Sequence, residues 1–426
     1  MEAGVVTKPA IARLASAIVA VAVFCGVVAL GLRGQGQRAP MDSDAPPIAY
    51  TTADKDSLVL LRGTAETARW PDPKTAHKQW RLDAPQFTED GRFLYTMART
   101  FRPGPSGTAK AQLVVIDARS NAVRVLPAPA DKQLAYGDEV RALEGSSVVW
   151  LGTDSSQRSA AETVSAPRRL IAMDLGDKDP GPRLLRSVAL PEPNAEEQAE
   201  NEHCPTCVRG GYLVGAGGGK VVLGRMNTYP GARGFADHLY LVAPDGSTRD
   251  LGHIPKAEND RPGLFSPDGK NFAYPDSAWG GASCGVGTRI VQFDLSSSWP
   301  GGRVLRTPFP QAEPYDEIRQ LWWTVDSKLR ISGNALVCDI FRPEGQRAAR
   351  TPSVWELRGD QWTQIDPDGF LLDVTLPNGD SVVVTEATAA PGYNRIDSLS
   401  IRHGGQLIRI ADDVGDVAVA SGCRAP

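Results

Sequence analysis

Residues 265–274 have the sequence FSPDGKNFAY, and this stretch decides the fold. It predicts two short β-strands around a tight turn at Asp268-Gly269, because glycine accepts the positive φ that such turns require. The strand after the turn alternates, so that Phe272 and Tyr274 lie on one face and Ala273 lies on the other. The stretch is therefore a β-hairpin with an apolar face to bury.

Two further strands follow this hairpin, at residues 289–295 (RIVQFDL) and 303–306 (RVLR). A single four-stranded unit cannot bury its own faces, so several copies of it are expected in a chain of this length. The hairpin rhythm recurs at a spacing of roughly 45–70 residues, which is the range of β-propeller blades. The further copies occupy residues 87–95, 140–151, 212–223, 323–331 and 374–384.

The sequence FSPDGKNFAY resembles the core of the TolB-like, or PD40 (WD40-like), β-propeller repeat. The match is close for residues 265–274 and fair for residues 87–95, whereas other copies have Thr324-Val325 or Thr375-Leu376 in place of Ser-Pro. The resemblance implies an all-β fold, a six-bladed β-propeller of four-stranded antiparallel blades, with seven blades as the alternative. It says little about function, because propellers include both binding modules and enzymes.

Two predicted strands lie outside the six copies, at residues 57–62 and 414–420. Propellers often close by completing one blade with strands from both ends of the domain, which removes exposed strand edges. These two stretches are therefore candidates for closing the ring.

The N-terminal region contains a strongly apolar, uncharged segment at residues 14–32 (LASAIVAVAVFCGVVALGL). At about 1.5 Å per residue, a helix of this length nearly crosses a bilayer core of roughly 30 Å. We expect a short tail at residues 1–13, a transmembrane signal-anchor helix at 14–32, a flexible linker at 33–56 and the propeller at 57–426. A cleaved signal peptide is the alternative, because Ala29-Leu30-Gly31 has the small residues that a peptidase requires.

Composition narrows the class of protein. The formal net charge of −4 gives no indication of nucleic-acid binding, and no cofactor motif is recognised. The chain contains six cysteines, a number that favours export of the domain after the span to an oxidising compartment. The expected location is the cell membrane, crossed once, with the propeller extracytoplasmic or extracellular.

Long connections are predicted between the second and third strands of the blades, and all of them emerge on one side of a propeller. Long loops on a rigid scaffold are where binding usually resides. Aromatic residues and arginine dominate the energetics of protein interfaces. We therefore predict that an envelope protein or glycan binds there, at residues Arg102, Tyr229, Arg233, Trp279 and Tyr393.

The cysteines after the apolar segment are predicted to form structural disulfides, because disulfides are the default in exported domains. Cys284–Cys338 is the preferred pair, since it would link the long loops of adjacent blades. Three more cysteines are candidates for disulfides: Cys204, Cys207 and Cys423. Because the five cysteines are odd in number, one thiol is left unpaired. A zinc site that uses Cys204 and Cys207 is a minor alternative.

The main prediction is a non-catalytic binding or scaffold module, and the alternative is a glycan- or lactone-acting hydrolase. Such an enzyme needs carboxylates clustered near the central channel, and five acids lie close to predicted first strands: Asp138, Glu139, Asp316, Glu317 and Asp373. A GxSxG match at residues 281–285 lacks the strand–turn–helix context of a nucleophile elbow, because a strand follows it. The sequence identifies neither the ligand nor the oligomeric state.

Overall fold

The structure is a computed structural model, and it describes residues 45–71, 80–100, 111–127, 140–152, 167–195, 198–199, 202, 208–227, 235–256, 262–279, 286–297, 301–308, 316–335, 352–366, 369–386 and 397–420. The propeller belongs to the compact unit Ala45–Pro426. The described ranges contain no helical segment with the length and hydrophobicity that a bilayer crossing requires. The anchor predicted at residues 14–32 lies outside them.

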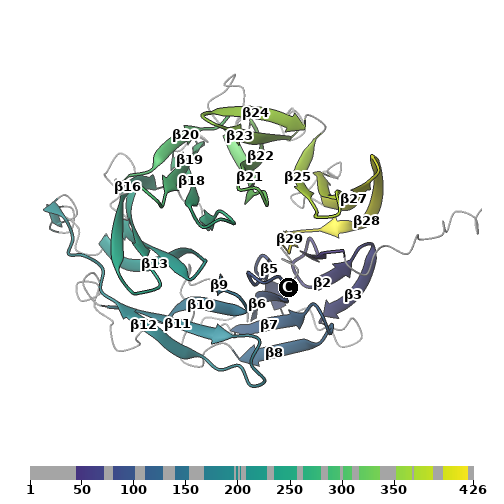
Figure 1. The fold of residues 1–426 in the computed structure, drawn as a ribbon, viewed down its shortest axis with the longest axis horizontal. Helices are drawn as coiled ribbons and strands as arrows, with labels where there is room; N and C mark the ends of the chain where they lie inside the picture. Colours follow the sequence, from purple (N-terminus) through teal and green to yellow (C-terminus); the bar gives the residue numbers. More distant parts are fainter. Residues whose placement is uncertain are drawn as a thin grey trace, which may run out of the picture. The chain divides into compact units, whose positions relative to one another are not determined.

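Seven antiparallel sheets surround a central axis and form the blades of a β-propeller (Figure 1). From the axis outward, blade 1 contains β29 (Val417–Val419), β1 (Pro47–Thr51), β2 (Leu58–Arg62) and β3 (Ala65–Trp70). Blade 2 contains β4 (Trp80–Leu82) and β5 (Gln86–Phe87), which both pair with β6 (Phe93–Thr100), followed by β7 (Ala111–Asp117) and β8 (Val123–Pro127). Blade 3 contains β9 (Arg141–Glu144), β10 (Ser147–Gly152), β11 (Arg168–Asp174) and β12 (Arg183–Val188).

The other four blades follow the same order. Blade 4 contains β13 (Val208–Gly217), β14 (Lys220–Asn227), β15 (Phe235–Val242) and β16 (Thr248–Lys256). Blade 5 contains β17 (Leu264–Phe265), β18 (Asn271–Trp279), β19 (Val286–Asp294) and β20 (Arg303–Arg306). Blade 6 contains β21 (Asp316–Trp323), β22 (Leu329–Ala335), β23 (Ser353–Arg358) and β24 (Gln361–Asp366). Blade 7 contains β25 (Phe370–Thr375), β26 (Ser381–Glu386), β27 (Asp397–His403) and β28 (Gln406–Val414).

The number of blades corrects the sequence prediction. Six blades is wrong, and the alternative of seven is confirmed. The six hairpin copies form blades 2 to 7. The two predicted strands outside them belong to one additional complete blade, blade 1, in which β29 pairs with β1. That blade includes Pro47–Thr51, which lies inside the segment predicted as a linker. The prolines of the segment are typical of a linker, but all five residues of Pro47–Thr51 are buried.

The turn that defined the repeat is confirmed at Asp268-Gly269. Gly269 has a φ of +66°, and its amide donates to the carbonyl oxygen of Ser266 over 2.8 Å. The Ser266 hydroxyl donates to a carboxylate oxygen of Asp268 at 2.6 Å and accepts from the Asn271 amide at 2.9 Å. Thr88 makes the same two contacts in blade 2, so the motif is a hydrogen-bonded unit rather than a bare turn.

The core lies between neighbouring blades. In the junction of blades 4 and 5, for example, Phe272 and Phe293 pack with Val222 and Leu239, and all four are almost fully buried. Each sheet therefore uses both faces against its neighbours, which explains why no single repeat could fold alone. The tryptophans of blade 6 follow this pattern, with Trp323, Trp355 and Trp362 packed on the cluster shared with blade 5.

Four arginines on outermost strands link successive blades, and we call them the inter-blade arginines. Each guanidinium donates to backbone carbonyls in the outer turn of the next blade. Arg124 donates to Leu175 and Asp177, and Arg186 to Ala243 and Pro244. Arg249 donates to Leu295 and Ser297, and Arg303 to Gly359. The contact recurs at four consecutive junctions, from blades 2 and 3 to blades 5 and 6.

Candidate functional site

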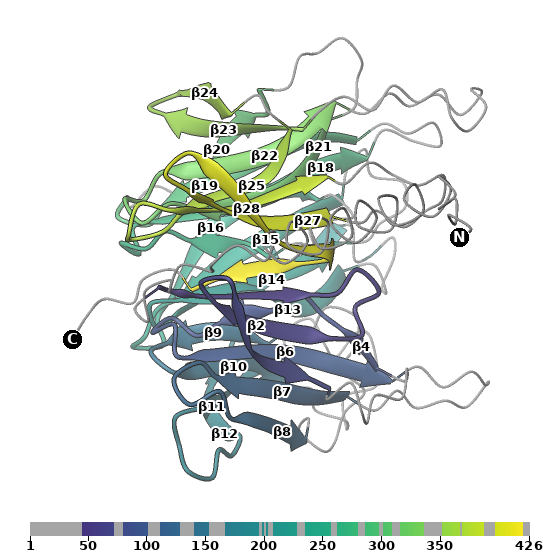
Figure 2. The ribbon, with the colours of Figure 1, turned by 90° about the vertical axis from the view of Figure 1, so that its right-hand side faces the viewer.

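The propeller has two different faces, which follow from the alternating strand directions. The turns that join the first to the second and the third to the fourth strand of each blade lie together, and we call this side the turn face. The other connections leave from the opposite side, which we call the loop face. Figure 2 shows the strands edge-on, with β6 running from the turn face to the loop face.

The predicted binding residues belong to connections of the loop face. Arg102, Tyr229, Arg233 and Tyr393 lie outside the described residues, within segments 101–110, 228–234 and 387–396. Trp279 is the last residue of β18, where its backbone pairs with Val286, and its side chain is not described. The strand ends that flank these residues share one face, so the topology on which the prediction depended is present.

The disulfide candidates lie outside the described residues as well. Cys204, Cys207, Cys284, Cys338 and Cys423 are all in undescribed segments, so the preferred Cys284–Cys338 pair stays a prediction. Among the described side chains, no group of three or more His, Cys, Asp or Glu is placed to hold a metal ion.

Of the five acids that the hydrolase alternative requires, Asp373 is the one whose side chain is described. It is buried in β25, where its Oδ2 atom accepts from Arg402 at 3.1 Å. Arg402 also donates to Asp366 at 3.2 Å and lies over the ring of Phe370. Asp373 is thus part of a structural ion-pair network. Asp316 and Glu317 open β21 but their side chains are not described, and residues 138–139 lie outside the described ranges.

A buried polar cluster lies at the junction of blades 3 and 4, near the loop face. Arg225 of β14 is only 1 % exposed, although it carries a charge. Its guanidinium donates to the Tyr240 hydroxyl at 3.0 Å and to the carbonyl oxygen of Pro191. Burying a charge is costly unless it is hydrogen-bonded, so these contacts hold Arg225 in place. They fix the start of the connection from blade 3 to blade 4 at Pro191.

A histidine extends this cluster. His238 of β15 pairs with Arg225 across the sheet and stacks on Tyr240, with ring centroids 4.5 Å apart and planes 18° apart. Its Nε2 atom is 2.6 Å from a carboxylate oxygen of Asp250 in β16. Because His238 is 6 % exposed, this His–Asp pair links β15 to β16 rather than presenting a base to solvent, and Arg225 adds β14 to the cluster. The cluster thereby fixes both strand ends that flank residues 228–234.

A second polar group lies at the inner strands of blades 2 and 3. Arg99 donates to Asp83 at 2.9 and 3.1 Å, and the Tyr95 hydroxyl donates to Gln86 at 3.0 Å. Burial raises the pKa of the Tyr95 hydroxyl. Burial also lowers the pKa of Arg141 to about 10, although nearby Tyr95 and Asp83 oppose that shift. Tyr95 and Arg141 thus lie buried where blades 2 and 3 meet.

The sequence contained a signal for the Arg225 cluster that was not used. Val221, Leu223 and Arg225 alternate along β14, and the first two belong to the apolar cluster shared with blade 3. An arginine that continues the buried face of a strand requires polar partners inside the protein. Arg225 could therefore have been identified as a buried, hydrogen-bonded cation, although its partners Pro191 and Tyr240 could not.

Comparison with protein-family models and with curated proteins finds no match. Among solved structures, TolB from Acinetobacter baumannii is 13% identical, with a TM-score of 0.36, over 88% of this chain and 83% of that one. Puromycin hydrolase is 17% identical, with a TM-score of 0.41, over 78% of this chain and 47% of that one. An acylaminoacyl peptidase from Pyrococcus horikoshii is 13% identical, with a TM-score of 0.44, over 84% of this chain and 48% of that one. The chain thus spans about half the length of the two hydrolases, and the similarity concerns the fold alone.

Proposed function

We propose that this protein is a binding or scaffold module whose partner docks on the loop face, at the junction of blades 3 and 4. The observation that carries the proposal is the buried Arg225 cluster. The cluster holds Pro191 and the adjoining ends of β14 and β15. Tyr229 and Arg233 belong to the stretch of sequence that connects these two strands. A rigid base under connecting segments is the arrangement that positions binding residues in other folds.

The chemistry of the segment indicates the class of partner. Segment 228–234 reads TYPGARG, with the aromatic residue Tyr229 and the arginine Arg233 within a short stretch. Tyrosine and arginine combine apolar area with hydrogen-bonding groups, and both are enriched where protein interfaces gain most of their energy. A protein or glycan of the cell envelope fits such a surface. We also propose that the propeller lies outside the cytoplasm and is anchored in the membrane by residues 14–32.

The test compares two sets of alanine variants in pull-downs from envelope extracts, read by quantitative mass spectrometry and glycan analysis. The first set changes the loop face at Arg102, Tyr229, Arg233, Trp279 and Tyr393. The matched control set changes three exposed residues of the turn face, Arg119, Lys178 and Asp360. We expect partners that the unmodified protein retains to be lost with the first set and kept with the control set.

A narrower pair of variants localises the contact. Tyr229→Ala with Arg233→Ala should remove most of the binding, whereas Arg102→Ala with Tyr393→Ala should remove less, because those residues belong to blades 2 and 7. Melting temperatures of all variants establish that the propeller is intact. If the loop-face set folds normally and retains the same partners in the same amounts, the loop face is not the binding surface.

A further inference from the structure

Four of the five cysteines that follow the apolar segment belong to connections of the loop face. Cys204 and Cys207 belong to the connection that leads into β13, and Cys207 directly precedes Val208, the first residue of that strand. Cys284 lies two residues before β19, and Cys338 lies three residues after β22. Because an extended chain spans at most about 3.6 Å per residue, Cys207, Cys284 and Cys338 stay within roughly 11 Å of strand ends on the loop face.

Cys423 leaves the propeller on the opposite side. β29 takes the place of the first strand in blade 1, so it runs from the loop face to the turn face and ends at Val419. The amide of Ala420, a buried residue, donates to the carbonyl oxygen of Pro47 at 3.1 Å, which holds this end of the chain at the turn face. Cys423 follows Ala420 by three residues, so it stays within roughly 11 Å of that point.

The body of the propeller separates Cys423 from the other four cysteines. β13 contains ten residues and β19 contains nine. At about 3.3 Å per residue, each strand carries the chain roughly 30 Å from one face to the other, whereas a disulfide requires Cα atoms within about 7 Å. Blades 4, 5 and 6, which carry the loop-face cysteines, are also not neighbours of blade 1 in the ring (Figure 1). Cys25 is no partner either, since it belongs to the predicted transmembrane segment.

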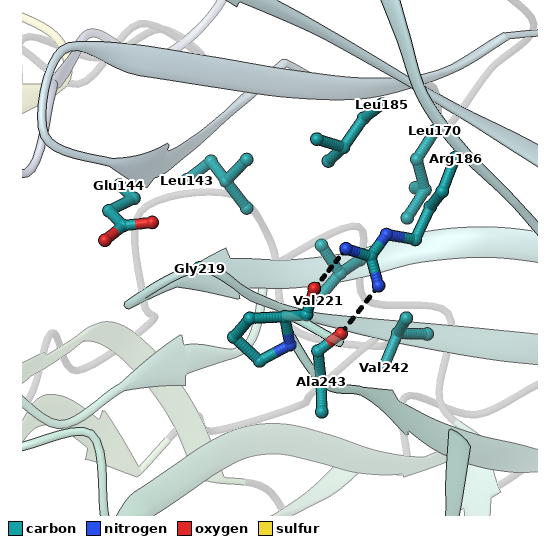
Figure 3. A pocket seen from close by; sticks show the side chains of 10 residues that line it. Leu143, Glu144, Leu170, Leu185, Arg186, Gly219, Val221, Val242 and Ala243 are labelled. Atoms are coloured by element: carbon teal, nitrogen blue, oxygen red, sulfur yellow. Dashed lines mark hydrogen bonds between the residues drawn. The ribbon is translucent and has the colours of Figure 1, made fainter. Parts of the chain in front are cut away.

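Neighbouring blades are already linked on the turn face by hydrogen bonds. Between blades 3 and 4, Arg186 donates to the carbonyl oxygens of Ala243 and Pro244 (Figure 3). In the same junction, the Gly219 amide donates to the Leu143 carbonyl oxygen at 3.0 Å. These contacts fix short turns without a covalent bond. The loop-face connections that carry cysteines are longer, so ordering them loses more conformational entropy, and a disulfide reduces that loss by restricting the unfolded chain.

The order of the blades selects the pairs within the loop-face set. Cys284 belongs to blade 5 and Cys338 to blade 6, so a bond between them links neighbouring blades. If Cys204 or Cys207 were bonded to Cys284 instead, Cys338 would have to reach past blade 5 to blade 4. The stretch CPTC at residues 204–207 offers a local bond, because the first and last residues of a β-turn have Cα atoms within about 7 Å, and proline is favoured at its second position.

We propose that the protein contains two disulfides, Cys284–Cys338 and Cys204–Cys207, both on the loop face, and that Cys423 is its unpaired thiol on the turn face. The inference rests on the proposed extracytoplasmic location. Each bond forms when two thiols lose two protons and two electrons to a disulfide oxidant outside the cytoplasm, whose own disulfide becomes two thiols. The covalent links thus order connections of the proposed binding face and leave the other face free of them.

The test is a peptide map of the full-length protein isolated from the cells that make it. The protein is denatured and alkylated with N-ethylmaleimide without reduction, and trypsin then leaves Cys284, Cys338 and Cys423 on three separate peptides. We expect the peptides of Cys284 and Cys338 to be linked. Cys204 and Cys207 should be joined within one peptide, and the peptide of Cys423 should carry the label. A bond between Cys423 and another cysteine of the same chain overturns the proposal.

A second sample separates the pairing from the location. Purified protein is reduced under native conditions, reoxidised with oxidised glutathione and mapped in the same way. If only this sample contains the two bonds, the extracytoplasmic location is wrong and the pairing is supported. If neither sample contains them, the pairing is overturned. No partner takes part in these measurements, so a failure of the proposed binding function would leave their result unchanged.

Single serine variants give an independent measurement. Cys284→Ser should make Cys338 reactive toward N-ethylmaleimide and should lower the melting temperature, because the link between blades 5 and 6 is lost. The matched control Cys423→Ser should leave both bonds and the melting temperature unchanged. If Cys338 stays unlabelled in the Cys284→Ser variant, it has another partner and the assignment of the pairs is wrong.

Discussion

At the scale of single residues, the turn motif shows how one backbone angle supports a blade. Three turns of the repeat have a residue with positive φ at the same place: Gly91 at +67°, Gly269 at +66° and Ser327 at +59°. Ser and Thr side chains at the start of these turns replace missing backbone contacts, and Thr324 bonds Asp326 as Ser266 bonds Asp268. The hydrogen-bonded side chain is thus retained even where glycine is not.

Gly269→Val should therefore destabilise the propeller by about 1 kcal/mol or more, because a β-branched residue is strained at positive φ. Thermal unfolding followed by circular dichroism measures the effect. Ser327→Gly is the matched control, since it removes the same strain at the equivalent position, and the melting temperature should stay unchanged or rise. A normal melting temperature for Gly269→Val would contradict the turn geometry.

The sequence contained enough to identify the hairpins but not all of their partners. The turn at Asp268-Gly269 could be predicted because its geometry depends on neighbouring residues alone. The copies at residues 87–95 and 374–384 could be predicted in the same way. Pro47–Thr51 was missed because its burial depends on pairing with β29, at the far end of the chain. Arg225 was missed for a similar reason, because its partners come from another strand and another blade.

At the scale of elements, the inter-blade arginines connect outer strands that otherwise have no sheet contact. Each satisfies backbone carbonyls in a turn of the next blade, and hydrogen bonds to a charged donor are stronger than those between neutral groups. The residues lie in ordinary strand sequences, and the sequence of β12, RLLRSV, contains two arginines. The contact could therefore not be predicted from the sequence, since nothing in the sequence distinguishes Arg186 from Arg183.

Arg186→Met should lower the free energy of unfolding by about 2 kcal/mol, because two carbonyl oxygens lose a charged donor while the apolar stem is kept. Arg183→Met on the same strand is the control, and its exposed position predicts a change within about 0.5 kcal/mol. Urea denaturation of both variants gives the comparison. Equal stability of the two would show that the arginine contact adds nothing to the junction.

At the scale of the whole molecule, closure of the ring depends on a short strand. β29 covers the inner edge of β1, whose Ile48 and Ala49 are fully buried. An uncovered edge of this kind is a template for pairing with another chain. The closing strand therefore protects the propeller from association as well as completing blade 1.

Removal of residues 417–426 should lower the melting temperature and produce dimers or larger species through the exposed edge of β1. Removal of residues 421–426 alone leaves β29 in place and should have little effect on either property. Size-exclusion chromatography with light scattering, together with thermal unfolding, measures both. A monomeric and equally stable product of the longer truncation would exclude this role of β29.

The location of the propeller is a separate prediction at this scale. Protease added to intact cells should degrade the part of the chain after residue 56, because the apolar segment and the cysteines favour an extracytoplasmic domain. Permeabilised cells provide the control for intrinsic protease sensitivity. Protection of the propeller in intact cells, together with accessibility of the N-terminus, would show that the orientation is reversed.

The pairing of β29 with β1 also constrains how the molecule is made. Asp416 and Thr51 are hydrogen-bonded although they are 365 residues apart in the chain, whereas the other sheets pair strands that follow one another closely. Contacts of such high sequence separation form slowly, because the chain loses conformational entropy on closing the loop before the new contacts stabilise it. Blades 2 to 7 can fold in order as the nascent chain emerges, but blade 1 must wait for its last strand. The growing protein therefore carries an incomplete sheet throughout its synthesis, and the inner edge of β1 stays unpaired until β29 has been made.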